Sequence, residues 1–209
     1  MLKVKICGIR RTEDLIWANN LMPDYIGFVF APSRRRITTD EALKTSKSLY
    51  GCIAKVGVFV NSSCEEIKEI AKVVRLDIIQ LHGDESPAFC ESLPLPVWKA
   101  FNISKEDDFD RISEFEGLIS AAVLDGFDGQ SLGGTGRTFD WRLVAGKKLN
   151  MPLVLAGGLN SAILEKACAI VNPDIVDVSS GVETDGFKDA FKVAEFIERA
   201  RSLKAYDKR

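Results

Sequence analysis

The sequence predicts a (β/α)8 TIM barrel, an α/β fold in which a closed ring of eight parallel strands is covered by helices. Three observations predict this class. Short β-branched segments alternate with amphipathic segments along the whole chain, which is typical of a parallel sheet. The alternation repeats eight times, and eight units favour a closed barrel over an open sheet. The first strand is not followed by a GxGxxG motif, so an open dinucleotide-binding sheet lacks its usual support.

We expect residues 1–209 to form a single domain. No Ser-, Gly- or Pro-rich linker divides the chain. A length of 209 residues suits one domain with a sizeable core, although it is short for eight strands and eight helices. The predicted strands are, in order, Val4–Cys7, Tyr25–Phe30, Ile53–Val60, Leu76–Leu81, Val97–Phe101, Ser120–Asp125, Leu153–Ala156 and Ile175–Val178.

The amphipathic segments between these strands predict helices. The clearest helix covers Ser62–Val74, with Asn61 or Ser62 as its N-cap and Glu65 as a capping-box partner. Its apolar residues recur at i, i+3, i+4 and i+7 and are Ile67, Ile70, Ala71 and Val74. A final helix is predicted over Phe187–Leu203. Its expected core contacts are Phe191, Ala194, Phe196 and Ile197.

Composition and charge limit the classes of function. Hydrophobic residues make up 46% and charged residues 28% of the chain, as in ordinary globular proteins. The formal net charge of −2 gives no electrostatic support for a nucleic-acid partner. No apolar run approaches the roughly 20 residues that span a bilayer, and the N-terminus lacks the apolar core of a signal peptide. We therefore expect no membrane association.

The cysteine and histidine content narrows the chemistry. Five cysteines are dispersed and lack CxxC spacing, so no disulfide framework or zinc site is expected, and a cytoplasmic location is the simpler interpretation. His82 is the single histidine, which excludes a multi-histidine metal site. A Ser-His-Asp triad would have to use it, and no GxSxG motif accompanies it. We predict no metal, and chemistry carried by carboxylates, lysines, arginines or thiols.

Polar residues stand at the carboxyl ends of several predicted strands. Because side chains alternate along a strand, Val4 and Ile6 share one face of the first strand, and Lys5 and Cys7 share the other. The apolar face should pack on helices, which leaves Cys7 pointing into the barrel at the end where such barrels have their active sites. The same argument brings other polar residues to this end, namely Gln80, His82, Asp125 and Asp177.

Each of these residues also has a purely structural interpretation. A cysteine in a strand is often a small buried hydrophobe, which would suffice to explain Cys7. Asp125 suits a cap of the following turn, and His82 suits a partner of the loop backbone. Lys99, in the fifth strand, suits either a structural lysine or a lysine that forms a Schiff base.

Two late loops have the residues of a phosphate site. Gly157 and Gly158 follow the seventh strand, and Ser179, Ser180 and Gly181 follow the eighth. Glycine lets backbone N–H groups approach an anion, and a following helix N-terminus favours negative charge. These two loops are the frequent phosphate locus of such barrels. We expect them to bind phosphate together.

Two further segments follow strands. The glycine-rich segment Gly126–Gly136 is predicted to be a lid over the active site. The segment Ser33–Ile37 contains Arg34, Arg35 and Arg36. Adjacent arginines are usually solvated, but at a strand end one of them can bind a carboxylate in a bidentate pair.

A series of short motifs runs through the chain in a fixed order. They are Lys5-Ile6-Cys7-Gly8-Ile9, Gly27-Phe28-Val29-Phe30, Ser33-x-Arg35-x-Ile37, Val56-Gly57-Val58-Phe59-Val60, Gln80-Leu81-His82-Gly83, Leu124-Asp125, Gly133-Gly134-Thr135-Gly136, Phe139-Asp140-Trp141, Gly157-Gly158-Leu159 and Asp177-Val178-Ser179-Ser180-Gly181-Val182-Glu183. No single motif is decisive. As an ordered set they resemble the phosphoribosylanthranilate isomerase family, which pairs a thiol on strand one with an acid on strand six.

The resemblance implies an Amadori rearrangement in tryptophan biosynthesis that needs no cofactor. It implies that Asp125 is the general acid that opens the furanose ring, and that Cys7 is the general base that removes the C2′ proton. Arg35 would contact the anthranilate carboxylate and Asp177 a sugar hydroxyl, with His82 also binding substrate. The expected partner is this small phosphosugar–anthranilate substrate, and the expected assembly is a monomer or a homodimer.

Some positions depart from the family pattern, and rival functions remain. Arg10 and Arg11 stand where smaller polar residues are expected, and Arg35 is chosen among the three arginines by the Ser-x-Arg-x-Ile spacing. A cation such as Lys5 is expected to lower the pKa of the Cys7 thiol. A related isomerase of histidine biosynthesis would place an aspartate on strand one. A Schiff-base aldolase would use Lys99, and a non-catalytic sugar-phosphate binding protein would need neither the thiol nor the acid.

Overall fold

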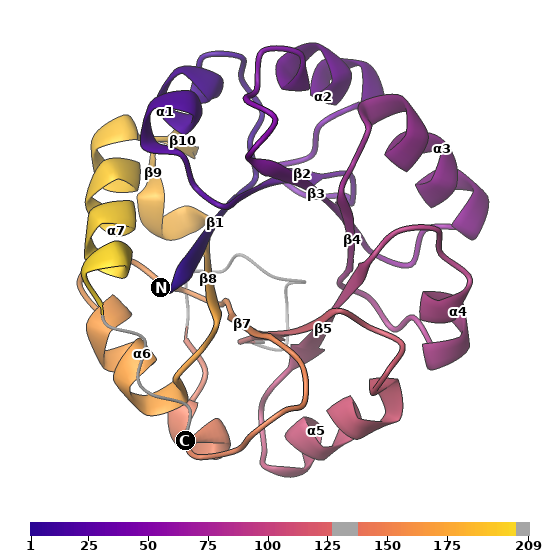
Figure 1. The fold of residues 1–209 in the computed structure, drawn as a ribbon, viewed down its shortest axis with the longest axis vertical. Coiled ribbons are helices and arrows are strands. Elements are labelled where there is room, and N and C mark those ends of the chain that lie inside the picture. The colour runs from indigo at the N-terminus through magenta and orange to yellow at the C-terminus, as the bar shows by residue number, and fades with distance from the viewer. Residues whose placement is uncertain (127–137, 204–209) are drawn as a thin grey trace.

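Eight parallel strands close into a barrel in their order along the chain. The computed structural model describes residues 1–126 and 138–203. Figure 1 looks into the ring of strands and shows the helices outside it, so the predicted fold class is confirmed. The strands are β1 Lys3–Cys7, β2 Tyr25–Val29, β3 Ala54–Phe59, β4 Ile78–Leu81, β5 Val97–Asn102, β6 Ala121–Asp125, β7 Leu153–Leu155 and β8 Ile175–Val178.

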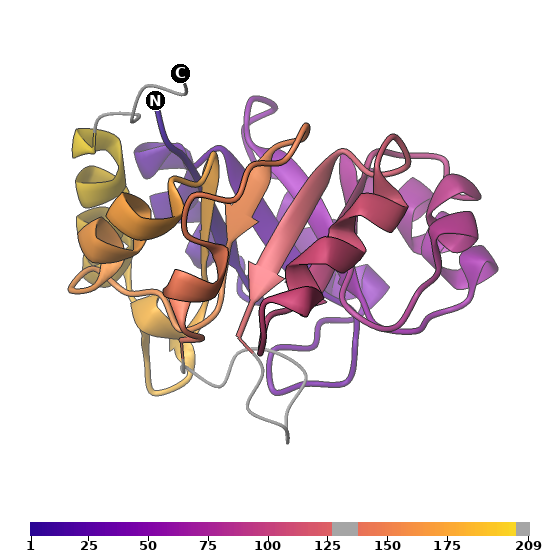
Figure 2. The same ribbon diagram turned by 90° about the horizontal axis from the view of Figure 1, so that it is seen from below.

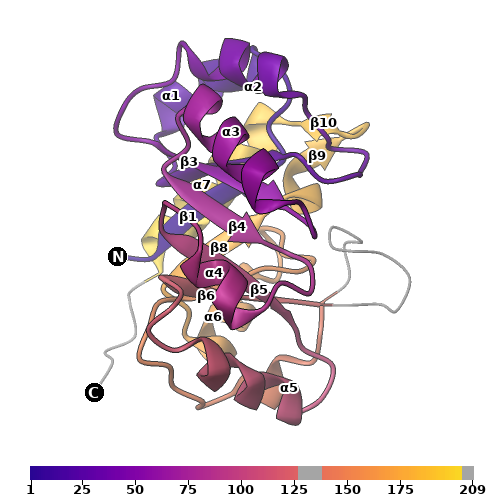
Figure 3. The same cartoon turned by 90° about the vertical axis from the view of Figure 1, so that its right-hand side faces the viewer.

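The helices outside the barrel differ widely in length. The α-helices are α1 Asp14–Leu21, α2 Thr39–Ser46, α3 Cys64–Val74, α4 Pro87–Glu91, α5 Asp107–Asp110, α6 Leu164–Val171 and α7 Ala190–Ser202, and the 3-10 helices are η1 Arg111–Phe115, η2 Trp141–Val144 and η3 Ser180–Val182. Figure 3 shows α3, α4 and α5 in succession along one side of the barrel. Because α4 has five residues and α5 four, short crossovers let a chain of this length complete the ring. No described helix is long and apolar enough to cross a membrane.

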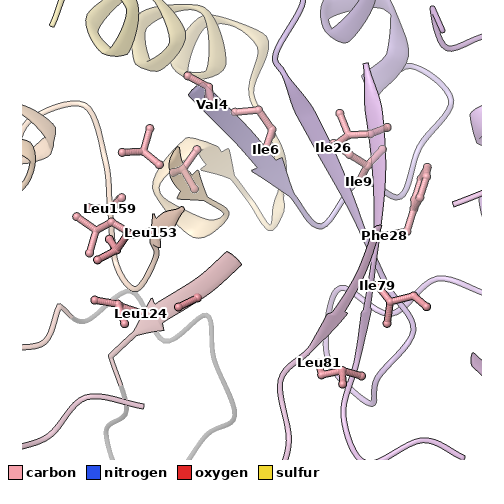
Figure 4. Close-up of a cluster of buried hydrophobic side chains, with 14 of the residues drawn as sticks. Val4, Ile6, Ile9, Ile26, Phe28, Ile79, Leu81, Leu124, Leu153 and Leu159 are labelled. Atoms are coloured by element: carbon pink, nitrogen blue, oxygen red, sulfur yellow. The ribbon is translucent and has the colours of Figure 1, made fainter. Parts of the chain in front are cut away.

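Two layers of apolar side chains pack against the barrel wall. Val4 and Ile6 of β1 are fully buried in the outer layer, between strands and helices, as the alternation predicts. Figure 4 shows both side chains pointing from β1 toward the helices. The inner layer fills the barrel with Val56, Trp98, Ala100, Ala121, Val123, Val154, Ala156 and Ile175. This filled interior leaves the carboxyl ends of the strands as the place for a site. In Figure 2 the arrowheads point to that side, and the N-terminus lies on the opposite side.

The predicted capping of α3 is wrong. The N-cap is Ser63, whose hydroxyl accepts a hydrogen bond from the Glu66 N–H at 3.2 Å. Asn61 instead adopts a left-handed backbone with a φ of 50°, and its side-chain oxygen accepts from the N–H of Asp84. The helix therefore starts two residues later than predicted, because the loop after β3 binds the loop after β4.

The start of the last helix is also different from the prediction. Two short strands, β9 Glu183–Thr184 and β10 Phe187–Lys188, pair in an antiparallel hairpin after β8. Asp189 then caps α7 by accepting from two backbone N–H groups of its first turn. Phe191 is consequently 88% exposed, so the prediction that it packs in the core is wrong. Ala194 is half-buried, and Phe196 and Ile197 are buried as expected.

Candidate active site

A cavity of about 280 Å³ opens among the carboxyl ends of the strands. Closing the barrel brings together residues that are far apart in the sequence. Nine of the predicted site residues line the cavity, namely Cys7, Arg35, His82, Asp125, Gly157, Gly158, Asp177, Ser179 and Ser180. Apolar side chains complete its wall, among them Val29, Val58 and Leu159. The cavity therefore combines titratable groups with an apolar lining, as ligand sites commonly do.

A buried ion pair crosses from β1 to β8 beside Cys7. Lys5 and Asp177 are paired in register, and the Lys5 Nζ donates to Asp177 Oδ2 at 2.7 Å. Lys5 is fully buried, and although burial opposes its charge, Asp177 and Cys7 raise its pKa, so it stays protonated. The other carboxylate oxygen of Asp177 is buried and has no hydrogen-bond partner among the described residues. This free oxygen is available to a ligand hydroxyl.

Cys7 lies at the end of β1 against Gly27 of β2. A β-carbon at position 27 would come within 2.7 Å of the Cys7 Sγ, so glycine leaves the room that the thiol occupies. The surrounding protein desolvates the thiol, and this burial raises its pKa although Lys5 and Lys188 oppose the rise. Lys5 thus lies on the same face of β1 as Cys7, as predicted. The expected lowering of the pKa of the Cys7 thiol is wrong, because desolvation outweighs the nearby cations.

Asp125 is held at the end of β6 by its own loop. Its Oδ1 accepts a hydrogen bond from the N–H of Gly126 at 2.7 Å. A β-carbon at Gly157 would come within 2.7 Å of the same oxygen, so the loop after β7 also lies against this carboxylate. His82 lies on the other side of the carboxylate. The rest of the predicted lid, from 127 to 136, falls outside the described residues.

Arg35 differs from Arg34 and Arg36 in its burial. Arg35 is 7% exposed and lines the cavity, whereas Arg34 and Arg36 are exposed. Its Nε and Nη2 donate to the two carboxylate oxygens of Glu183 at 2.7 and 2.9 Å. Glu183 also pairs with the buried Lys188. No role was predicted for Glu183 or Lys188, and the acidic end of the motif after β8 was the one signal in the sequence that pointed to Glu183.

The two loops predicted to bind phosphate lie in the cavity wall with one exception. Gly157 and Gly158 have φ values of 78° and 66°, which an L side chain rarely adopts. The Ser179 hydroxyl donates to the Cys7 carbonyl oxygen at 2.9 Å. Gly181 does not line the cavity, because it packs where a β-carbon would collide with the carbonyl oxygen of Leu159.

Lys99 lies outside the cavity. Its neighbours in β5 point into the barrel, so its own side chain points toward the helices. There the Nζ donates to the carbonyl oxygens of Gly83 and Ala100 and lies 3.4 Å from the buried carboxylate of Glu85. Glu85 in turn accepts from the N–H of Gly83, the residue after His82. Lys99 therefore supports the loop that carries His82.

A family profile and individual protein sequences show similarity to the same enzyme family. The profile of the family described as N-(5'phosphoribosyl)anthranilate (PRA) isomerase matches residues 4–199. The chain is 46% identical to the N-(5'-phosphoribosyl)anthranilate isomerase of Thermoanaerobacter sp. (strain X514), covering 98% of this chain and 100% of that protein.

Solved structures give the same result. The phosphoribosyl anthranilate isomerase of Thermotoga maritima superposes with a TM-score of 0.89 at 38% identity, covering 97% of this chain and 100% of that one. A phosphoribosyl anthranilate isomerase in complex with reduced 1-(o-carboxyphenylamino)-1-deoxyribulose 5-phosphate gives a TM-score of 0.85 at 36% identity, with the same coverage.

Proposed function

This chain belongs to the N-(5'-phosphoribosyl)anthranilate isomerase family, and we propose that its cavity performs the isomerisation with Asp125 as general acid and Cys7 as general base. The reaction is a step of tryptophan biosynthesis in which an aminoaldose becomes a ketose. The observation that carries the assignment is that one cavity contains a thiol, a carboxylate and two Gly/Ser loops.

The first step in this proposal is ring opening. Asp125 gives a proton to the furanose ring oxygen, and the anthranilate nitrogen forms a protonated Schiff base with C1′. The Gly126 N–H bond to Oδ1 stabilises the carboxylate that remains. A positioned acid of this kind contributes roughly 10²–10⁴ in rate.

The second step is removal of the C2′ proton by Cys7. Burial disfavours the thiolate in the free protein. The positive charge that ring opening creates on the substrate lies one carbon from C2′ and stabilises the thiolate form of Cys7, which takes up the C2′ proton and becomes the thiol. The resulting enolamine tautomerises to the ketose. The substrate nitrogen itself supplies the imine, so these steps use only side chains.

Four further groups would complete the substrate site. Arg35 would contact the anthranilate carboxylate, and the free oxygen of Asp177 would accept a hydrogen bond from a sugar hydroxyl. The backbone around Gly157, Gly158, Ser179 and Ser180 would bind the phosphate, and the positive φ values of Gly157 and Gly158 suit a close approach of backbone N–H groups to an anion. His82 would complete the site beside Asp125.

The test is turnover by the purified protein. Loss of the fluorescence of N-(5'-phosphoribosyl)anthranilate should follow addition of the protein without any cofactor. A dephosphorylated substrate should react far more slowly if the two loops bind phosphate. Absence of turnover would contradict the activity, and equal turnover of both substrates would contradict the phosphate site alone.

The isomerase of histidine biosynthesis is the alternative with the most similar chemistry. It would be expected to carry an aspartate on strand one, where this chain has Cys7 at the end of β1. Turnover of the aminoaldose substrate of that pathway, measured beside the anthranilate adduct, decides between the two.

A further inference from the structure

Glu183 connects two parts of the cavity wall without lining the cavity itself. Its side chain is 6% exposed. Its carboxylate forms ion pairs with the buried cations Arg35 and Lys188 and with the exposed Arg34. The Oε1 accepts from Arg35 Nε at 2.7 Å and from Lys188 Nζ at 2.8 Å, and the Oε2 accepts from Arg35 Nη2 at 2.9 Å. Although burial opposes it, Arg35 and Lys188 lower the pKa of Glu183 to about 2. Glu183 is therefore ionised at neutral pH.

The contact with Arg35 fixes the plane of the guanidinium group. A bidentate pair uses the edge formed by Nε and Nη2, which leaves the end formed by the two Nη atoms for any other carboxylate. The stem of Arg35 lies against Gly8, where a β-carbon would come within 2.6 Å of the Arg35 Cδ. The arginine is thus held at its stem by the loop after β1 and at its head by Glu183.

The contact with Lys188 reaches the loop after β8. The Lys188 side chain is 1% exposed, and its Nζ donates to the carbonyl oxygen of Ser179 at 3.0 Å and to its hydroxyl at 3.2 Å. Ser179 lines the cavity and also bonds to the Cys7 carbonyl oxygen. Glu183 therefore holds Lys188 in place to support the loop that we assign to phosphate.

The charges of this cluster favour an anionic ligand. Arg35 and Lys188 bring two buried positive charges, and Glu183 brings one negative charge. A buried cation without a partner is strongly disfavoured, so both cations depend on this carboxylate while the cavity is empty. The remaining positive charge is available to a substrate carboxylate.

We propose that Glu183 is a positioning residue that holds the guanidinium of Arg35 in the orientation that binds the aromatic carboxylate of the substrate. The proposal rests on the function proposed above and names the residue that sets its specificity for a carboxylated aromatic ring. Glu183 acts through Arg35, while its effect through Lys188 concerns the phosphate end. Binding at the two ends can therefore be separated by the choice of ligand.

The experiment compares two ligands that differ in one carboxylate. They are reduced 1-(o-carboxyphenylamino)-1-deoxyribulose 5-phosphate and the corresponding phenylamino compound. The wild-type protein should bind the carboxylated ligand at least about tenfold more tightly, as a charge-assisted bidentate pair predicts. In Glu183→Gln this preference should fall to about threefold or less. Because both ligands carry the phosphate, effects on the phosphate loop cancel in the ratio.

Three variants control the result. Glu195→Gln makes the same chemical change in an exposed pair with Arg199 and should keep the full preference. Lys188→Met should weaken both ligands by a similar factor and keep the ratio. Glu183→Gln combined with Lys188→Met removes one cation with the anion, which keeps the test valid if the single variant does not fold.

The outcomes separate this inference from the proposed function. An undiminished preference in folded Glu183→Gln, or in the double variant, would overturn the role of Glu183 while leaving the site intact. Equal binding of both ligands by the wild-type protein would overturn the carboxylate contact of Arg35 and the role of Glu183 with it. Failure of the wild-type protein to bind either ligand would contradict the proposed site as a whole.

Discussion

The Nε2 of His82 lies 3.2 Å from the Oδ2 of Asp125. The two groups are within ion-pair distance but lack the alignment of a hydrogen bond. On the other side of the ring, the Nδ1 lies 3.3 Å from the amide nitrogen of Gln80. The imidazole therefore lies between the Gln80 amide and the Asp125 carboxylate. The one histidine of the chain thus adjoins the carboxylate that we propose as the acid.

The acid is tested by Asp125→Asn. The amide keeps the shape of the side chain but cannot give a proton, so kcat should fall at least about 10². Binding of reduced 1-(o-carboxyphenylamino)-1-deoxyribulose 5-phosphate should stay within a few-fold of the wild-type value. The control is Asp107→Asn, at an exposed position, which should leave kcat unchanged. Turnover near the wild-type level in Asp125→Asn would remove this residue from the mechanism.

The base is tested by comparing two cysteines. Cys7→Ala should fold, bind the product analogue and lose at least about 10² in kcat, and Cys7→Ser should be little better because a hydroxyl does not ionise near neutral pH. Cys168→Ala removes a buried thiol from α6 and should alter stability while sparing turnover per folded molecule. If Cys7→Ala kept more than about a tenth of the wild-type kcat, the thiol would not be the base.

Two glycines with similar backbone conformations test the contact between the loop after β7 and the carboxylate of Asp125. Gly157 and Gly146 have φ values of 78° and 72°, so alanine at either position should cost about 1–2 kcal/mol of stability. An alanine at position 157 would also collide with Asp125 Oδ1 and the Gly126 N–H, whereas nothing lies near position 146. Gly157→Ala should therefore lower kcat by roughly 10², while Gly146→Ala should not change it. Similar kcat values for both variants would show that this contact is unimportant.

The buried carboxylate of Glu183 predicts a pH dependence of stability. Its pKa is about 2 in the folded protein and close to the ordinary 4.5 in the unfolded chain. The unfolded chain therefore takes up the proton first as the pH falls. The stability that this group contributes is complete above about pH 4.5 and is lost as the pH falls toward about 2.

Denaturant unfolding at several pH values between 5 and 2.5 measures this loss. Glu183→Gln should be less stable at neutral pH and should lose less stability on acidification than the wild-type protein does. Glu195→Gln, at an exposed position, should keep the steeper dependence. The same slope in Glu183→Gln and the wild-type protein would contradict the low pKa.

The sequence by itself determined where the strands lie and which residues end them. The local pattern of hydrophobic residues indicates which segments are buried strands. Side-chain alternation along each strand then determines the face on which each residue lies. Parallel strands in a closed ring bring their carboxyl ends together, so Cys7, Asp125 and Asp177 had to meet once the fold class was known. This part of the site followed from spacing alone.

The tertiary structure decided the partners of these residues and the balance of their charges. Lys5 pairs with Asp177, and Arg35 pairs with Glu183, across separations that no sequence pattern encodes. Phe191 became exposed because the hairpin before α7 delayed the start of the helix. The pKa of Cys7 rises, contrary to expectation, because desolvation sums over every atom around the thiol, whereas the sequence reveals only the nearest charge. Ion pairs and burial depend on the closed barrel as a whole, and therefore only the folded chain defines them.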